Sequence, residues 1–421
     1  MTRLRHLSSR GLAALLVAIV AGATVLAVGA TALAGNGRNQ PSTDLATALH
    51  SALVAPPVPG VSADIKFTNN LIDSSSVGAH GNPLLTGATG RLWASNDGRL
   101  RLELQSNRGD AQIVVNQGTF SLYEASSNTV YRGALPQSEG KNEAGKPDAA
   151  KPHALPTVAE IQTKLNDLAK HVTLSGAIGG NTGGQPSYTV KLAPAHDGGL
   201  LGRVELAWDA ATGAPLRAAV YAQGDGNPVL ELAATQIKYG SVSPSVFSVS
   251  APPGAKVVDV KVPSSTSGGA KDAKQAKAHK TDKAHATKAE VTGVSAVQAK
   301  LPFTLAAPDQ LATLPRTNVR LLEMNGHPAA LVTYGQHLGA IAVLERSADK
   351  GQTPSKPAPP AGSDPQGDGG GSLPSISVNG ATGNELATAL GTLISFKRGA
   401  VSYVVAGSVP SAAAEAAARG L

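Results

Sequence analysis

The sequence predicts a mainly β protein whose larger part is one strongly curved antiparallel sheet of about eleven strands, with two amphipathic helices. Between residues 42 and 262, short runs of alternating apolar and polar residues recur, and turns rich in Gly, Asn and Asp separate them. Two segments of this range, 42–54 and 157–172, instead have apolar residues at helical spacing. Aromatic residues make up 3% of the chain, so Leu, Val and Ala fill most of the alternating positions.

The first elements are a helix, a strand and a hairpin. Residues 42–54 repeat leucine at every fourth position after a Ser or Thr that can cap the helix. In 62–69, Ile65 and Phe67 alternate with polar residues, which predicts a strand. Asn96-Asp97-Gly98 is a strong hairpin turn. The strand after this turn places three leucines on one face: Leu100, Leu102 and Leu104.

The second helix is expected to begin at Thr157, because Thr157 and Glu160 have the spacing of a capping box. Its opposite side is polar, so this helix is a candidate lid over one face of the sheet. Its apolar stripe consists of Val158, Ile161, Leu165, Leu168 and Val172.

Residues 204–222 form a predicted hairpin with a five-residue turn from Asp209 to Gly213. Glu205 and Arg217 fall on one face of it, which is expected to be exposed to solvent. The apolar side chains of both strands fall on the other, concave face: Val204, Leu206, Trp208, Leu216, Ala218 and Val220.

The strand 228–239 changes phase along its length. Its first apolar residues, Leu230 and Leu232, are out of phase with those near its end. A bulge near Thr235 or Gln236 would produce this shift.

The apolar face of the sheet has two interpretations, between which the pattern does not decide. The helices and side chains can pack a dry core, or incomplete packing can leave an apolar cavity for a ligand. The candidate cavity residues are Ile65, Phe67, Leu100, Leu102, Leu104, Val204, Leu206, Trp208, Leu216, Val220, Leu230 and Leu232.

A smaller α+β domain is expected over 291–421, after a Lys- and Ala-rich linker at 263–290. Its elements are three short strands with a turn at 325–326, a short helix at 384–390, two further strands and a final Ala-rich helix. A stretch rich in Pro, Gly, Ser and Asp at 350–372 predicts a disordered insert.

Residues 1–35 have the order of an export signal. Three arginines precede an uncharged run of 24 residues, Gly11–Ala34, which ends in small residues. The run is longer than a signal core of ~7–15 residues and close to the ~20 that span a bilayer. A cleaved signal peptide and an uncleaved anchor both remain open, and under either one the rest of the chain lies outside the cytoplasmic membrane.

The composition argues against several function classes. The chain has no cysteine, which excludes thiol catalysis and cysteine-based metal sites. The amino-terminal arginines and the linker lysines account for six of the seven net positive charges, so no folded part has a nucleic-acid footprint. Nucleotide-binding, zinc-protease and serine-hydrolase motifs are absent, and the ten histidines are scattered. We therefore expect no enzyme activity, no metal and no cofactor.

The sequence resembles the extracytoplasmic lipoprotein-carrier superfamily, which includes LolA, the sigma-factor regulator RseB and the mycobacterial lipid-binding lipoproteins. The resemblance covers about residues 42–262 and rests on "GRLWASNDGRLRLEL", "VVNQGTFSLYEASSNTVYRG", "VELAWDAATGAPLRAAVY" and "LELAATQIKYGSVSPSVFSVSAPPGAKVVDV". It implies an unclosed β-barrel with a helical lid and an apolar cavity for acyl chains of a lipid or lipoprotein. The alternative is an RseB-like sensor that regulates a membrane partner such as an anti-sigma factor.

Overall fold

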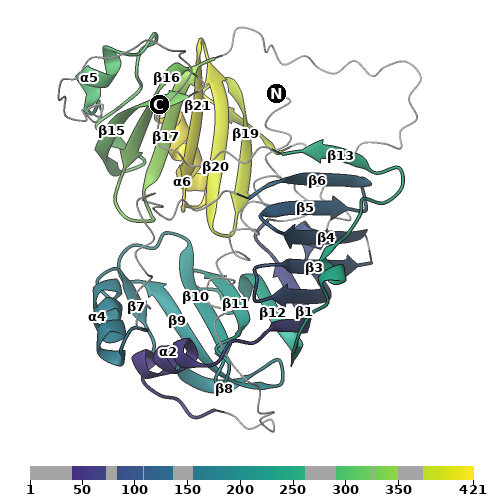
Figure 1. Ribbon diagram of the computed structural model, residues 1–421. Coiled ribbons are helices and arrows are strands. Elements are labelled where there is room, and N and C mark those ends of the chain that lie inside the picture. Colours follow the sequence, from purple (N-terminus) through teal and green to yellow (C-terminus); the bar gives the residue numbers. More distant parts are fainter. Residues whose placement is uncertain are drawn as a thin grey trace, which may run out of the picture.

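The computed structural model describes residues 40–72, 83–107, 109–135, 155–260, 291–324, 326–348 and 373–421. Within them the chain forms a 13-stranded sheet and an 8-stranded sheet (Figure 1). Strands dominate and a few helices accompany them, which confirms the predicted fold class. The predicted signal or anchor (1–35), linker (263–290) and insert (350–372) lie outside the described residues.

The large sheet consists of two meanders that meet at β1, which pairs with both β2 and β12. At one end of the sheet, β13 pairs in parallel with β6. The count exceeds the predicted eleven because β7 and β8 are short strands in a Gly-rich segment without clear alternation. The strands are β1 (Gly60–Asn69), β2 (Ala88–Ser95), β3 (Leu100–Ser106), β4 (Gly109–Asn116), β5 (Thr119–Glu124), β6 (Thr129–Ala134), β7 (Val172–Leu174), β8 (Ile178–Thr182), β9 (Gln185–Pro194), β10 (Leu201–Asp209), β11 (Pro215–Ala222), β12 (Pro228–Tyr239) and β13 (Lys256–Asp259).

The turn between β10 and β11 has the predicted chemistry. The Asp209 carboxylate accepts hydrogen bonds from the N–H groups of Ala211 and Thr212 at 2.9 and 2.7 Å. Gly213 has a φ of +67°, a conformation that favours glycine. This turn fixes the register of the two strands.

The predicted bulge in β12 is also present. The pairing with β1 passes from Asp64–Gln236 directly to Ile65–Ala234, so Thr235 is the extra residue. The bulge brings the apolar residues at both ends of β12 to the same face of the sheet.

Two helices pack against each other beside β9 and β10: α2 (Leu45–Val54) and α4 (Val158–Leu168). Asp44 caps α2, because its side chain accepts a hydrogen bond from Thr47 N at 3.0 Å; Ser42 and Thr43, the predicted caps, do not. A short helix α3 (Pro83–Thr86) and a 3₁₀ turn η1 (Pro244–Phe247) complete this part.

The Thr157–Glu160 capping box of α4 is confirmed, with hydrogen bonds of 3.3 and 2.8 Å. The helix ends at Leu168, however, one turn before the predicted end. Val172 therefore belongs to β7 and not to the helical stripe, because pairing with Pro194 of β9 replaces the last helical turn.

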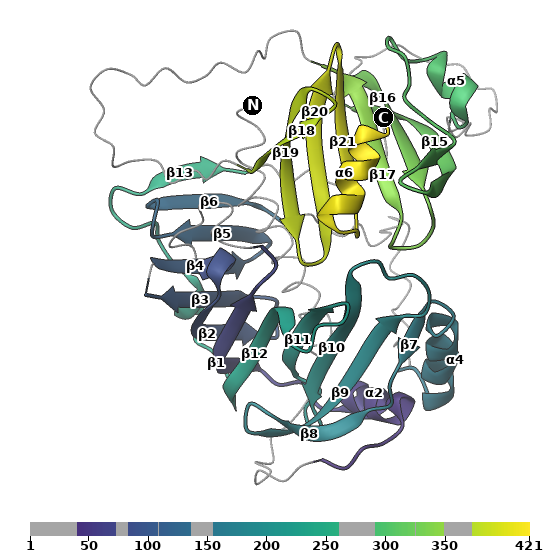
Figure 2. The ribbon, with the colours of Figure 1, turned by 180° about the vertical axis from the view of Figure 1, so that it is seen from behind.

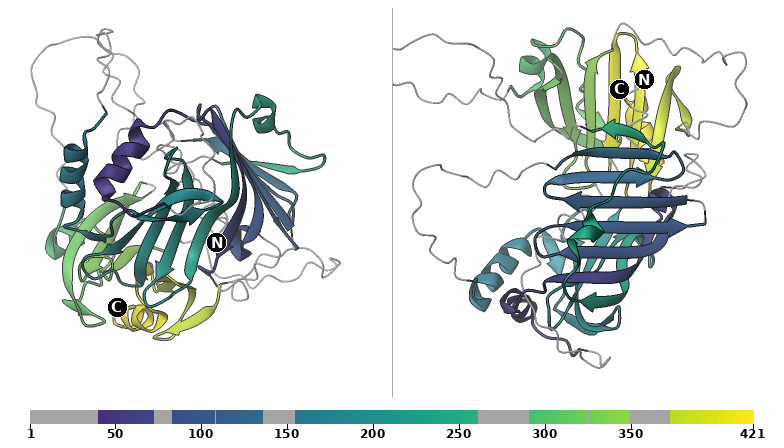
Figure 3. Two further views of the ribbon diagram at one scale, coloured as in Figure 1. Left: turned by 90° about the horizontal axis from the view of Figure 1, so that it is seen from below. Right: turned by 45° about the vertical axis from the view of Figure 1, so that its right-hand side comes forward.

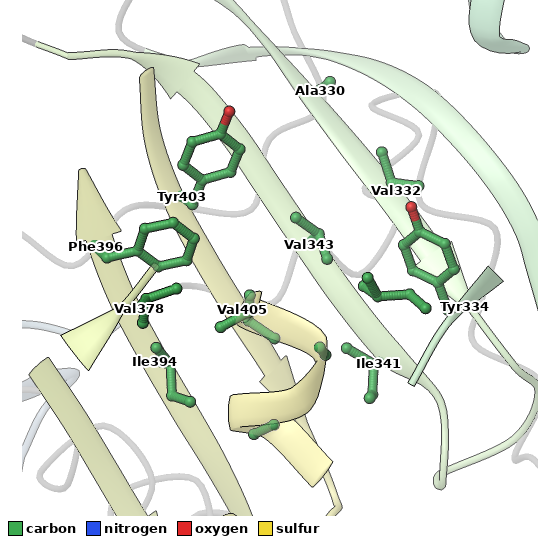
Figure 4. Close-up of a cluster of buried hydrophobic side chains, with 14 of the residues drawn as sticks. Ala330, Val332, Tyr334, Ile341, Val343, Val378, Ile394, Phe396, Tyr403 and Val405 are labelled. Atoms are coloured by element: carbon green, nitrogen blue, oxygen red, sulfur yellow. The ribbon is translucent and has the colours of Figure 1, made fainter. Parts of the chain in front are cut away.

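The small sheet has its own apolar core, which Figure 4 shows in close-up. The segment 384–390, predicted as a helix, lies mostly in β19; there, pairing with β18 and β20 overrides the helical propensity of Glu, Leu and Ala. The final helix is confirmed as α6. The elements are α5 (Val294–Gln298), β14 (Gln310–Leu311), β15 (Leu314–Met324), β16 (His327–Tyr334), β17 (Ile341–Ser347), β18 (Ser375–Val378), β19 (Ala381–Thr388), β20 (Gly391–Arg398), β21 (Val401–Gly407) and α6 (Ser411–Arg419).

The small sheet lies against strand ends of the large sheet (Figure 2). Backbone hydrogen bonds at this junction join Leu200 to Ser408 (3.1 Å), Leu338 to Asp197 (3.2 Å) and Ala389 to Leu71 (2.9 Å). His196 and His337 stack across it with ring centroids 4.8 Å apart. Loops, and not apolar side chains of the two cores, therefore carry the described contacts between the sheets.

Candidate ligand-binding face

One face of the large sheet carries the alternating apolar side chains, and α2 and α4 pack on it. The sheet curls so that this face is concave (Figure 3). We call it the inner face. It has three regions that differ in how completely their side chains are covered.

The first region is a packed cluster over β1 and β3–β5. Six of the twelve candidate cavity residues belong to it, with exposed fractions between 1% and 4%. They pack against Leu84 of α3 and against Ile113 and Leu122. This region therefore has the character of a dry core. The six residues are Ile65, Phe67, Leu100, Leu102, Leu104 and Leu216.

The second region lies under the helices and is centred on Trp208. The Trp208 and Tyr188 rings are 6.0 Å apart, and Leu45 and Ala48 of α2 complete the cluster. Sequence reasoning included Trp208 but missed its neighbours. Their signal was present in "SYTVKLAP", where Tyr188, Val190 and Leu192 alternate with polar residues.

The third region, which we call the open strip, crosses β10–β12 between the other two. Leu206 is 40% exposed, although Val190, its neighbour in the register, is buried. Cross-strand pairing aligns Leu206 with Ala218 and Leu232 in one row, and Val204 with Val220 and Leu230 in the next. Partial exposure of adjacent apolar side chains on a concave face is what an unfilled binding groove requires. The open strip consists of Val204, Leu206, Val220, Leu230 and Leu232, of which all but Leu206 are half-buried. Leu230 and Leu232 form its border, because they also pack against the first cluster.

The predicted lid helix covers less of this face than its stripe suggests. Ile161 is buried and Leu165 packs against the Trp208 cluster, but Val158 and Leu168 are 37% and 41% exposed. The helix packs instead against α2, where His50 Nδ1 lies 3.0 Å from the Pro156 carbonyl oxygen. Within the described residues, α4 thus covers the Trp208 end of the inner face.

The opposite, outer face corrects the prediction for Glu205. Alternation places Glu205 and Arg217 there, as predicted, but Glu205 is 7% exposed and not open to solvent. Its carboxylate accepts hydrogen bonds from Arg203 Nε (2.8 Å), Arg217 Nη1 (2.9 Å) and Tyr221 OH (3.1 Å). Arg217 Nε also donates to Glu231 at 2.5 Å. Long charged side chains on neighbouring strands cover one another, which a single-strand pattern does not reveal.

The electrostatics of this network stabilise the charged form of Glu205. Burial raises the pKa of the carboxyl, but the hydrogen bonds from Arg203, Arg217 and Tyr221 outweigh it and lower the pKa to about 2. The hydrogen bonds of the network join side chains of β10, β11 and β12 across the outer face.

The outer face also bears a cleft of about 630 Å³ between β4–β6 and the segment 247–259. Its walls combine apolar side chains with serine and threonine hydroxyls, and its one arginine, Arg132, is paired with Asp259 at 2.8 Å. None of the predicted cavity residues lines it. The candidate ligand-binding surface predicted from the sequence therefore lies on the inner face and not in this cleft.

Among the described residues, no group of three His, Asp or Glu side chains could hold a metal ion. No described helix combines the length and apolar character needed to cross a bilayer.

Comparison with known proteins gives similarities of structure. No protein-family model matches the chain, and no curated protein is similar at significance. The structure of the Pseudomonas aeruginosa MucA/MucB complex is similar with 14% identity and a TM-score of 0.38, over 89% of this chain and 94% of that one. MucB in complex with MucA(peri) is similar with 13% identity and a TM-score of 0.36, over 85% and 91%. A putative outer membrane lipoprotein-sorting protein domain from Vibrio parahaemolyticus has 11% identity and a TM-score of 0.14, over 45% and 88%.

Proposed function

We propose that this chain is an extracytoplasmic binding protein that takes acyl chains of a lipid or lipoprotein onto the inner face of its large sheet. The open strip is the observation that carries the proposal. The strip is apolar, concave and partly exposed, and packed apolar clusters flank it on both sides. A carrier or chaperone role needs no catalytic group, which agrees with a structural role for the Glu205 network.

Burial of methylene groups supplies the binding energy in this proposal. Each methylene removed from water contributes about 0.8 kcal/mol, so a long acyl chain binds without a specific polar contact. The helices α2 and α4 lie at the Trp208 end of the strip, where they would shield the acyl chain from water. Such a site discriminates weakly between acyl chains and releases them when a competing apolar surface is offered.

Replacing Leu206 with glutamate tests this function. We expect the affinity for a fluorescent fatty acid to fall at least about tenfold, since a charge on the strip opposes burial of the chain. The free energy of unfolding should change by less than about 1 kcal/mol, because Leu206 is already 40% exposed. The measurements are fluorescence titration and urea denaturation of the same samples.

Val257→Glu is the matched control, because Val257 is 43% exposed on β13, outside the inner face. It should bind the fatty acid like the unmodified protein. Equal loss in both variants, or absence of binding by the unmodified chain, would contradict the acyl-binding role.

A second candidate is a regulatory role in which the chain contacts a membrane protein. The observation that favours it is the small sheet, whose core is complete without the large sheet and which adds no described residue to the inner-face clusters. Acyl binding on the inner face does not require the small sheet, whereas binding of a partner protein would give the small sheet a function.

A photo-crosslinker tests this second candidate in the full-length chain. Placed at Leu338, which is 50% exposed beside the junction of the two sheets, it should capture one membrane protein reproducibly from native membranes. The same crosslinker at Val257 should not capture that protein. Identical products from both positions would count against a specific partner.

A further inference from the structure

One segment lies across the apolar face of the small sheet and belongs to no helix or strand. We call residues 299–309, between α5 and β14, the strap. Its side chains Leu301, Phe303 and Leu305 pack on the core without being fully buried. The strap is therefore the cover of that core, and its removal would expose the core to water.

Three side chains hold the middle of the strap by hydrogen bonds. At its ends, backbone bonds join Leu301 N to the Gln298 carbonyl (3.2 Å) and Arg316 N to the Asp309 carbonyl (2.8 Å). Gln298 donates to the Phe303 carbonyl at 2.9 Å and accepts from Leu305 N at 2.8 Å. Arg316 donates to the Ala307 carbonyl. Ala306 N donates to Glu345 Oε2 at 2.9 Å. Of these three side-chain attachments, only the one to Glu345 rests on a carboxyl group.

Glu345 lies on the core side of β17, in phase with Ile341 and Val343, and its exposed fraction is 0%. Its other oxygen, Oε1, has no hydrogen-bond partner among the described residues. The hydroxyl of Tyr334, also at 0%, has no partner there either. A buried carboxylate with one unsatisfied oxygen is costly when it is charged and far less costly when it is protonated.

The charged and titratable groups around Glu345 do not neutralise it. Arg398 of β20 acts on it through space, and no described Lys, Arg or His lies within ion-pair distance. Tyr403 of β21 and Ala330 of β16 lie opposite it in the register, whereas Tyr334 lies further along β16, opposite Ile341. Arg316 and Asp309 lie near the strap end. Burial raises the pKa of Glu345 to about 7, against smaller lowering by the Ala306 N–H and Arg398.

We propose that Glu345 is a proton-controlled latch for the strap. The protonated carboxyl tolerates burial and keeps the Ala306 N–H as its donor, so the strap stays closed. When the carboxyl loses its proton, hydration of the carboxylate favours the state in which the strap has lifted.

The direction with pH follows from the two protonation states. With the strap lifted, Glu345 has its ordinary pKa of 4.5, whereas with the strap closed the pKa is about 7. At a pH between 4.5 and 7, lifting of the strap therefore releases a proton from Glu345. The equilibrium constant for lifting rises with pH in this range, by at most about tenfold per pH unit, and levels off above pH 7. The strap is closed most firmly in acid, and the equilibrium constant for lifting is about 40-fold higher at pH 7 than at pH 5.

Amide hydrogen exchange of the full-length protein tests the latch. In the unmodified chain, the protection factors of Leu305 and Ala306 should fall about 40-fold from pH 5 to pH 7, after correction for the intrinsic exchange rate. Amides of the core strands, such as those of Ile394 and Val405, should keep theirs. In Glu345→Gln, which retains an acceptor for Ala306, strap protection should not change with pH.

Glu385→Gln is the matched control, since Glu385 is a buried glutamate of the same sheet whose carboxylate accepts a hydrogen bond from Ser411. In Glu385→Gln, the protection of the strap amides should fall with pH as it does in the unmodified chain. Strap protection that is constant in the unmodified chain, or equally pH-dependent in Glu345→Gln, would overturn the latch. A parallel loss of protection in the strap and in the core strands would also overturn it, because it would indicate unfolding of the whole sheet.

Discussion

Replacing Glu205 with alanine is expected to lower the free energy of unfolding of the large sheet by about 3–5 kcal/mol. The substitution leaves Arg217, whose side chain is 20% exposed, and Arg203 without their shared acceptor. Both tryptophans of the chain, Trp93 and Trp208, lie in the large sheet, so urea denaturation followed by their fluorescence reports on this sheet alone.

Asp64→Ala is the control for this effect. Asp64 pairs with Arg91 at 3.5 Å, with both side chains more than half exposed, and its loss should cost less than about 1 kcal/mol. Similar values for the two variants would show that the Glu205 network does not hold the outer face together.

The same network predicts acid sensitivity. Glu205 has a pKa of about 2 in the folded chain and 4.5 in the unfolded one, so the unfolded state takes up a proton first as the pH falls. The stabilisation is complete above pH 4.5 and is lost between about 4.5 and 2, by about 3 kcal/mol in total. In Glu205→Gln, the free energy of unfolding should not show this loss between about pH 4.5 and 2.

Leu102→Ala is the second substitution with a large expected effect. Leu102 is 2% exposed in the packed cluster of the inner face, so its truncation removes buried contacts and leaves a cavity. We expect the free energy of unfolding to fall by about 2–5 kcal/mol, measured as for Glu205→Ala.

Leu206→Ala is the matched control on the same face. Because Leu206 is 40% exposed, the same truncation should cost less than about 1 kcal/mol. Equal costs at the two positions would mean that the open strip is packed in solution, which would remove the physical basis for acyl binding there.

Most of the fold could be predicted from local patterns, because a turn or a cap is encoded within a few residues. Asp209 and Gly213 fix one hairpin, Thr157 and Glu160 begin one helix, and the phase change in β12 marks the bulge at Thr235. The errors arose where pairing between distant segments overrides local propensity. Residues 384–390 have helical composition, yet hydrogen bonds to β18 and β20 hold most of them as a strand.

The candidate site was predicted less completely, because alternation assigns a residue to a face but not to a degree of burial. Leu102 and Leu206 have the same pattern in the sequence, yet one is buried and the other is exposed, since different elements cover them. For Glu205 the alternation predicts exposure to solvent, yet its side chain is buried. Lys191, Glu205 and Glu231 belong to one row across β9–β12, and this row becomes visible only after the strands are placed in order.

The position of β1 between β2 and β12 has a consequence for how this chain assembles. The hairpins β2–β6 and β9–β12 join neighbours in the sequence, but Val61 of β1 pairs with Tyr239, near the end of the sheet-forming segment. Each meander can form early at a small entropic cost, whereas joining them closes a long loop and is expected to be the slow step. Until that step, a chain emerging from its amino terminus presents the unpaired edge of β1 and the leucines of β3 to water. We therefore expect the chain to be most prone to aggregation before β1 pairs with β12, while the edge of β1 is still unpaired.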